Sequence, residues 1–202
     1  CPGSLAIAAE TNAIPAVIGE FGMAAQHFPI LFTGNDAAPI VAVGLARNNL
    51  FVTDGKWADN TYAPAYLRRY PFVFMQSDED GNFLLALDAD SEQVNQGVSD
   101  EGEPLFVDGK ATELVDNAMK FCADFTREHE QTRQFSAALK AQDLLVDRSI
   151  DVTLNSGEKM SVNGFQVVDV EKFGKLPDDI IVAWHRNGWL ASIHHHLSSL
   201  AR

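Results

Sequence analysis

The sequence predicts an α+β fold, with antiparallel β meanders and hairpins, a long helix and a C-terminal helical pair. Short apolar runs separated by turn signals such as Asp54-Gly55 and Asp80-Gly81 indicate strands joined by tight turns. From Thr112 onward the apolar residues keep helical spacing, which indicates the long helix. After Pro177, a helix start is followed by an Asn187-Gly188 break and a second apolar stripe, which indicates the helical pair.

The first part of the chain is predicted to form short elements. Residues 16–27 indicate a short helix or loop, and the apolar runs at 28–33, 39–45 and 49–54 indicate strands of a meander. The segment "PAYLRRY" (64–70) is predicted to be a helix of about two turns, because proline suits a first helical turn and cannot occupy a helix interior.

The next elements are a hairpin and a polar connection. The apolar runs 71–76 and 83–88 are predicted to pair across the acidic turn at 77–82. A long acidic connection over 89–110 then leads to the helical half of the chain.

The second half is predicted to hold the longest elements. The helix from Thr112 is either continuous or broken near His129, because Glu128 and Thr132 interrupt its apolar stripe. Alternating residues in 149–162 predict a hairpin around a Ser156-Gly157 turn, which "GFQVVDV" extends.

Composition limits the possible partners. The chain of 202 residues carries a formal net charge of −13, a sign that disfavours nucleic acid and anionic membrane surfaces. No apolar run approaches the roughly 18 residues of a membrane span, so membrane insertion is not expected. Between Arg69 and Lys110 there are many acids and no base, which is typical of a solvated surface and also suits a face for a basic partner.

Cysteine usage indicates the compartment. Cys1 and Cys122 are the two cysteines, so no disulfide framework is indicated and a cytoplasmic location is expected. Because the chain begins with Cys rather than Met, residues 1–16 are interpreted as a tag or a disordered N-terminus, and export is left open.

The run His194, His195 and His196 raises the possibility of a metal site, and His194 and His196 are its candidates. On a helix, residues two apart point roughly 200° away from each other, so they do not share one ion as an i,i+4 pair does. The preferred interpretation is structural: His194 and His196 flank a core face, and His195 faces water beside Ser192 and Ser199. We therefore predict no metal and no cofactor.

Other catalytic signals are absent from the sequence. The nearest helical base to Cys122 is His129, about 10 Å along the helix, which is too far for an activated thiol. The acids of 88–99 fail as a calcium loop because Gln93 stands where that loop needs glycine and Ser99 where it needs glutamate. No nucleotide, hydrolase or zinc-protease motif occurs, so no catalytic residue is predicted.

The segment "YAPAYLRRYPF" is the predicted binding site. It holds all three tyrosines of the chain beside two arginines, the residue types that dominate binding hot spots. On a helix, the tyrosines four apart share one face while the arginines project elsewhere. The alternatives are that the tyrosines are core residues and that the arginines pair with the acids that follow. The candidate binding residues are Tyr62, Tyr66, Arg68, Arg69 and Tyr70.

Several segments together resemble the bacterial SapC family. They are "EFGMAAQHFPILFTG", "PIVAVGL…NLFVTDGKW", "YAPAYLRRYPFVF", "GFQVVDVEKFGKLPDD" and "WHRNGWLASIHHHLSSL", in the order and spacing of the family. The resemblance implies a single SapC-like α+β domain over 17–202. It also implies a soluble protein named for a surface-layer locus, encoded near TonB-dependent receptors, tryptophan-halogenase-like proteins and cupin-like proteins. It is distinct from the peptide-transporter permeases that share the name, and it implies no known reaction.

Three functions follow as hypotheses. The first is a non-enzymatic accessory protein that binds a protein partner of an outer-membrane (TonB-dependent) uptake or cell-surface system. The second is an enzyme of unknown reaction, in its metal-assisted form using His27, His185 or the terminal histidines. The third is a structural surface-layer protein. The sequence specifies neither a small-molecule ligand nor an oligomeric state.

Overall fold

The computed structural model describes residues 8–46, 48–76, 83–95, 97, 102–153, 157 and 159–201. It confirms an α+β fold. The main sheet has the strand order β1-β3-β2-β13-β12, and every neighbouring pair is antiparallel. Its strands are β1 (Ala13–Pro15), β2 (Ile30–Thr33), β3 (Ala38–Ala42), β12 (Leu145–Thr153) and β13 (Lys159–Val168). The sheet therefore joins the beginning of the chain to its last third.

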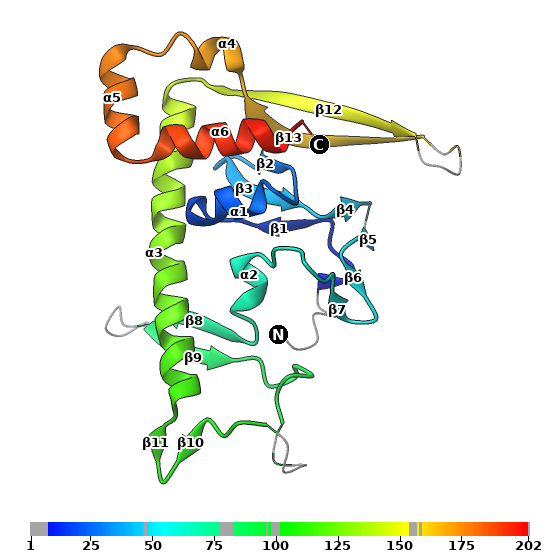
Figure 1. Cartoon of the computed structure of the whole chain (residues 1–202), viewed down its shortest axis with the longest axis vertical. Helices are drawn as coiled ribbons and strands as arrows, with labels where there is room; N and C mark the ends of the chain where they lie inside the picture. Colours follow the sequence, from blue (N-terminus) through cyan, green and yellow to red (C-terminus); the bar gives the residue numbers. More distant parts are fainter. Residues whose placement is uncertain are drawn as a thin grey trace.

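The two faces of the sheet carry different apolar clusters, as the alternation of side chains along a strand requires. Ile30 and Phe32 of β2 are fully buried in the main core, together with Phe21, Phe28 and Phe135. Leu31, between them on the opposite face, joins a second cluster with Phe165 and Val167. The β12–β13 hairpin extends beyond the body of the molecule (Figure 1).

The helix α6 (Trp189–Ser199) fastens the two parts of the main sheet together. β2 and β13 pair at Thr33–Phe165 and Phe32–Gln166, and the same register, continued two residues further, would set Ile30 opposite Val168. The His196 ring occupies that position instead: its Nε2 accepts from the Val168 N–H (3.1 Å), and its Nδ1 lies 2.8 Å from the Ile30 carbonyl oxygen.

The partners of His196 determine its protonation state. An N–H only donates and a carbonyl only accepts, so the ring is neutral with its proton on Nδ1. Burial lowers its pKa to about 4, opposed by the hydrogen bond to Ile30. Ser199 completes the junction, because its Oγ accepts from the Ile30 N–H (2.9 Å) and donates to the His196 carbonyl (2.6 Å).

The long helix α3 (Glu113–Ala141) is continuous, and the predicted alternative of a break near His129 is wrong. Thr132, which interrupts the apolar stripe, is buried because its hydroxyl donates to the Glu128 carbonyl and accepts from the Ile18 N–H. Phe135 and Leu139, in the C-terminal half, pack in the main core. The N-terminal half continues past the sheet toward the β8–β9 hairpin (Figure 1).

The middle of the chain forms separate two-stranded ribbons rather than one meander. The predicted strand 49–54 is divided, because Asn49 is buried and uses its side chain to bind the Ala8 carbonyl and the Phe51 N–H. The Asp54-Gly55 turn is confirmed between Thr53 and Lys56, and both its residues have positive φ. The ribbons are β4 (Gly44–Leu45) with β5 (Asn48–Asn49), and β6 (Val52–Thr53) with β7 (Lys56–Trp57).

The remaining predicted hairpins have the expected places. β8 (Phe72–Gln76) pairs with β9 (Phe83–Leu87), while the predicted acidic turn 77–82 lies outside the described residues. β12 pairs with β13, with a register shift between Arg148 and Ile150, and the Ser156 of the predicted turn is also outside the described residues. The connection over 89–110 ends in a small ribbon of β10 (Phe106–Val107) and β11 (Lys110–Ala111).

Short helices complete the fold. They are the 3-10 helix η2 (Ile18–Glu20), α1 (Phe21–Ala24), α2 (Ala65–Arg68), α4 (Val170–Phe173) and α5 (Asp178–Arg186). The predicted helical pair is confirmed: α5 ends at Arg186, Asn187 caps it, and Gly188 has φ 75°, a conformation that favours glycine, before α6 begins. Among the described residues, no helix combines the length and the hydrophobicity that a bilayer crossing requires.

Part of the segment predicted as a tag or disordered N-terminus belongs to the domain. β1 is an edge strand of the main sheet, and Ile14 within it is fully buried. Residues 1–7 lie outside the described residues. The boundary expected at residue 17 therefore does not separate the domain from what precedes it.

Acid should destabilise the protein through His196. Its pKa of about 4 in the folded state lies below the ordinary 6.5, so its contribution is complete above pH 6.5 and is lost as the pH falls toward 4. We expect this residue to remove about 3 kcal/mol from the free energy of unfolding across that window. Urea unfolding at a series of pH values measures the loss.

His196→Gln should be less stable than the unmodified chain at neutral pH, and the difference should shrink as the pH falls. His194→Gln changes an exposed histidine of the same helix and is the matched control. The same pH dependence in the unmodified chain and in His196→Gln would contradict this role.

Candidate functional site

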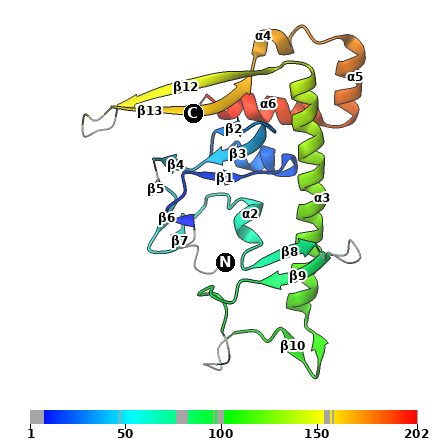
Figure 2. The same ribbon diagram turned by 180° about the vertical axis from the view of Figure 1, so that it is seen from behind.

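The predicted binding segment lies where α2 meets the N-terminal half of α3 (Figure 1, Figure 2). α2 is a single turn rather than the two expected, and it begins after Pro64, whose fixed φ suits a helix start. Leu67 points into the main core, while Tyr66 and Arg68 are exposed. One side of the segment is thus fixed to the main core, and the other side is exposed to solvent.

Glu20 is the anchor, and it is a buried carboxylate that the sequence analysis did not single out. Its Oε1 accepts from the Val17 N–H (2.9 Å), and its Oε2 accepts from the Tyr62 hydroxyl (3.0 Å) and the Ala65 N–H (2.7 Å). Three donors offset the cost of burying the acid, which is 5% exposed. Glu20 therefore holds the start of α2 to the N-terminal part of the chain.

Tyr62 continues this network toward the surface. Its hydroxyl donates to Glu20 and accepts from the Arg68 Nη2 (2.9 Å). Burial, together with the nearby Glu20 charge and against the opposing effect of Arg68, raises the pKa of Tyr62 to about 12. The phenol is therefore protonated at physiological pH and remains a hydrogen-bond donor to the carboxylate.

Both arginines stack on aromatic rings of α3 and of their own segment. The guanidinium carbon of Arg68 lies 5.3 Å from the ring centre of Tyr62 and 5.4 Å from that of Phe121. That of Arg69 lies 4.4 Å from Tyr66 and 4.9 Å from Phe125. Such contacts within about 6 Å are attractive cation–π interactions. We call this surface, formed by Tyr62, Tyr66, Arg68, Arg69, Tyr70, Phe121 and Phe125, the aromatic–arginine face.

The arginines do not pair with the described acids of the region that follows them. Arg68 donates to the Tyr62 hydroxyl and the Ala63 carbonyl, and Arg69 forms no hydrogen bond or ion pair with another described side chain. Tyr70 makes the contact to that region instead, because its hydroxyl donates to Asp88 (2.9 Å). The alternative that the arginines pair with these acids is therefore not found among the described residues.

The tyrosines divide between structural and exposed roles. Tyr66 is 38% exposed and its ring centre lies 6.5 Å from that of Phe125, while Tyr62 and Tyr70 are partly buried and hydrogen-bonded. Tyr66 and Tyr70 thus do not form one inward-facing pair. Phe121 and Phe125 belong to the apolar residues of the predicted long helix, and their spacing of four residues places them on a shared face.

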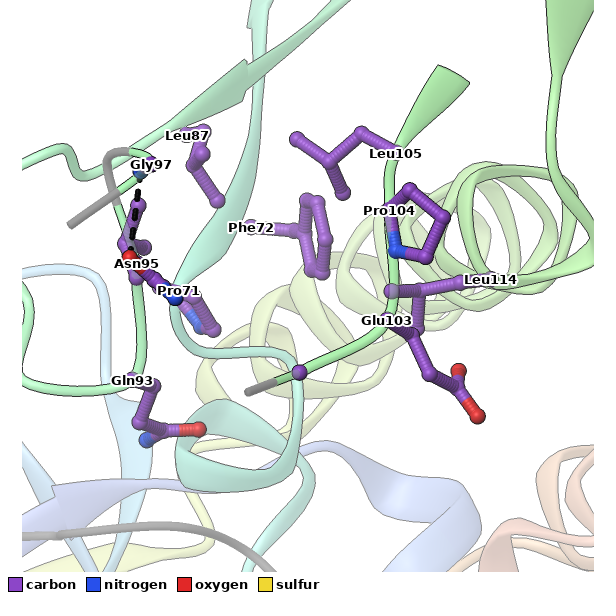
Figure 3. A pocket seen from close by; sticks show the side chains of 12 residues that line it. Pro71, Phe72, Leu87, Gln93, Asn95, Gly97, Glu103, Pro104, Leu105 and Leu114 are labelled. Carbon is purple, nitrogen blue, oxygen red and sulfur yellow. Dashed lines mark hydrogen bonds between the residues drawn. The ribbon is translucent and has the colours of Figure 1, made fainter. Parts of the chain in front are cut away.

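Several cavities lie at or near this face, and two of them share part of their lining. The arginine cavity, of about 440 Å³, is bordered by Arg68, Arg69, Phe121 and Cys122 among others. The Phe72 cavity, of about 540 Å³, is bordered by apolar side chains of β8, β9, α3 and the 89–110 connection, and by Gln93, Asn95 and Glu103 of that connection. Pro71, Phe72, Gln93 and Leu114 border both. Figure 3 shows the Phe72 ring in the middle of the second cavity.

Cys122 is a buried side chain of the arginine cavity rather than an exposed thiol. It is 2% exposed, and burial raises its pKa while the charge of Arg69 partly lowers it. A raised pKa leaves little thiolate at neutral pH. This environment suits the structural role that the sequence indicated.

The structure separates the three consecutive histidines. His196 uses both ring nitrogens on the backbone of β2 and β13, which leaves neither for a metal. His194 is exposed, with its ring centre 5.6 Å from that of Phe173. Ser192 and Ser199 were expected to lie beside His195 on the water-facing side of the helix, and this is wrong. Both serines are buried with His196 on the side of α6 that packs against the core. In the described part of the chain, no three His, Cys, Asp or Glu side chains gather as a metal site would require.

Comparison with known proteins gives one match. The family model described as SapC matches residues 2–202. No curated protein and no solved structure matches the chain.

Removing the Glu20 carboxylate should release α2 and destabilise the whole chain. Glu20→Ala leaves three donors without their acceptor, so we expect a loss of about 3 kcal/mol in the free energy of unfolding, measured by urea denaturation. Hydrogen exchange at the Ala65 amide should also accelerate.

Glu130→Ala is the matched control, because Glu130 is exposed on α3 in a surface ion pair with Arg133. Its cost should stay below about 1 kcal/mol. Equal losses in the two variants would show that Glu20 has no special role.

Proposed function

The chain belongs to the SapC family, and we propose that it is a non-enzymatic accessory protein that binds a protein partner through the aromatic–arginine face. The partner belongs to an outer-membrane (TonB-dependent) uptake system or a cell-surface system, which is the setting that the family resemblance implies. The absence of any catalytic motif from the sequence motivates the non-enzymatic role.

The arginine stacking is the observation that carries the proposal. Arg68 and Arg69 lie on four aromatic rings, which restricts their side chains before any partner arrives. Binding then costs less conformational entropy than it would for free arginine side chains. Tyrosine and arginine are also the residues most enriched in interface hot spots.

Charge supports a partner with acidic groups at the contact. The chain carries a net charge of −13, yet this face presents two guanidinium groups that have no carboxylate partner among the described residues. An acidic side chain of a partner would gain charge-assisted hydrogen bonds here. The surrounding negative charge would disfavour contact elsewhere on the surface.

Location forms part of the same proposal. The low cysteine content supports a reducing compartment, and we therefore place the protein in the cytoplasm. Fractionation of native cells, followed by immunoblotting, tests this placement. Recovery of the protein from the cell surface would instead favour the surface-layer role.

Affinity capture from native cells tests the binding role. The full-length chain and a Tyr66→Ala/Arg69→Ala variant are used as baits, and the recovered proteins are identified by mass spectrometry. We expect the unmodified chain to recover a component of the uptake or surface system and the variant to lose it, because truncating hot-spot residues typically costs about 2 kcal/mol or more.

Ile181→Ala/Arg186→Ala provides the matched control, since it removes one apolar side chain and one arginine from α5. This control should recover the same partner as the unmodified chain, and circular dichroism should show that both variants are folded. A folded Tyr66→Ala/Arg69→Ala variant that keeps every partner would refute the proposed site.

A further inference from the structure

The arginine cavity has an unusual charge for this chain. Both Arg68 and Arg69 border it, and no described aspartate or glutamate does. The sequence has 28 acidic residues and 15 Lys and Arg residues, so a concave site with two positive groups and no described negative group stands out against the rest of the surface. A concave site lined by one sign of charge concentrates ligands of the opposite sign.

Arg69 is the better placed of the two for an anion. Its guanidinium rests against the rings of Tyr66 and Phe125, and it makes no hydrogen bond or ion pair to another described residue. The donor groups of its planar fork are therefore available for a carboxylate, which binds such a fork in a bidentate manner. Arg68 has already committed donors to Tyr62 and Ala63 and supplies a second positive charge.

The adjoining Phe72 cavity supplies an apolar surface. Figure 3 shows the Phe72 ring surrounded by Leu87, Leu105 and Leu114, with Pro104 close by. Phe72 and Leu114 also border the arginine cavity, whereas neither arginine borders the Phe72 cavity. A molecule that spans the two cavities would thus meet the two arginines at one end, while Glu103 borders the other end and disfavours a carboxylate there.

We propose that the two cavities together bind a small organic acid with an apolar body. The carboxylate pairs with Arg69 and Arg68, and the apolar body lies along Phe72 and Leu114. Each cavity is within the usual range of ligand pockets, about 300 to 1,000 Å³, and such sites combine an apolar lining with a few placed polar groups. This site shares Arg68 and Arg69 with the proposed protein-binding face, and ligand binding there does not require a partner.

Calorimetric titration of the isolated chain with phenylbutyrate tests the proposal. Phenylbutanol and phenylbutylamine keep the apolar body and replace the carboxylate with a neutral or a positive group. We expect phenylbutyrate to bind and the other two to bind at least about tenfold more weakly, because a charge-assisted hydrogen bond contributes more than about 1.4 kcal/mol.

Two variants test the charge and the free space of the arginine cavity separately. Arg69→Gln removes the charge, and Ala118→Leu fills the arginine cavity with an apolar side chain while leaving both arginines in place. Each should weaken phenylbutyrate binding at least about tenfold. The matched controls are Arg127→Gln and Ala123→Leu, which make the same changes at exposed positions of α3 and should leave binding unchanged.

Cys122 gives a local readout of occupancy, because it borders the arginine cavity. In a Cys1→Ser background, phenylbutyrate should slow the reaction of Cys122 with a thiol reagent at alkaline pH, and it should not do so in folded Ala118→Leu. Thermal unfolding followed by circular dichroism establishes that each variant is folded.

Several results would overturn the proposal. They are no binding of phenylbutyrate, equal binding of phenylbutanol, inorganic phosphate binding as tightly as phenylbutyrate, or folded Arg69→Gln and Ala118→Leu variants with unchanged affinity. A peptide ending in a free phenylalanine carboxylate that binds where phenylbutyrate does not would also overturn it, in favour of a peptide terminus. Of the two test variants, Ala118→Leu keeps Arg69, which the protein-binding face also uses. Partner capture with Ala118→Leu therefore distinguishes failure of this proposal from failure of the proposed protein-binding role.

Discussion

The hydrogen bonds of His196 to Ile30 and Val168 are the constraint on which the fold depends. β2 and β13 pair directly over a short distance, and the imidazole and the Ser199 hydroxyl then satisfy the backbone groups that direct pairing would have used. α6 is thereby fixed to both strands at once. α6 and Phe135 of α3 pack in the same core, so the junction that fixes α6 also fixes the position of the long helix.

Glu20 has the same function at the other end of the core. It is a buried polar group whose partners are mostly backbone N–H groups, and it ties a segment near residue 20 to α2. Both side chains are costly to bury and both are fully hydrogen-bonded, which makes them specific: an apolar residue would fill the space without fixing which segments meet. The exposed aromatic–arginine face is thus held by an interaction that is itself buried.

The sequence was informative where a local pattern determines structure. Helical spacing from Thr112 and the Asn187-Gly188 break predicted α3 and the helical pair, and the resemblance predicted the family. It was uninformative where a polar residue finds its partner far along the chain. Glu20 has no local signature in the sequence, and the partner of His196 is the distant carbonyl of Ile30. Thr132 is a polar residue within the apolar stripe of α3, and its two hydrogen bonds allow it to be buried there. The candidate segment itself was identifiable from composition, but its stacking on Phe121 and Phe125 depends on a helix placed by those distant contacts.

The strand order of the main sheet has a consequence for biosynthesis. β2 is an inner strand whose second neighbour, β13, begins at Lys159, and His196, which closes their junction, lies 166 residues after Ile30. A nascent chain therefore emerges with an unpaired edge on β2 until β13 and α6 have been made. Such non-local pairing slows folding and exposes apolar strand edges to other chains. The core is consequently complete only after α6 has been made, and chaperone binding to the emerging β1, β2 and β3 strands would bridge that interval.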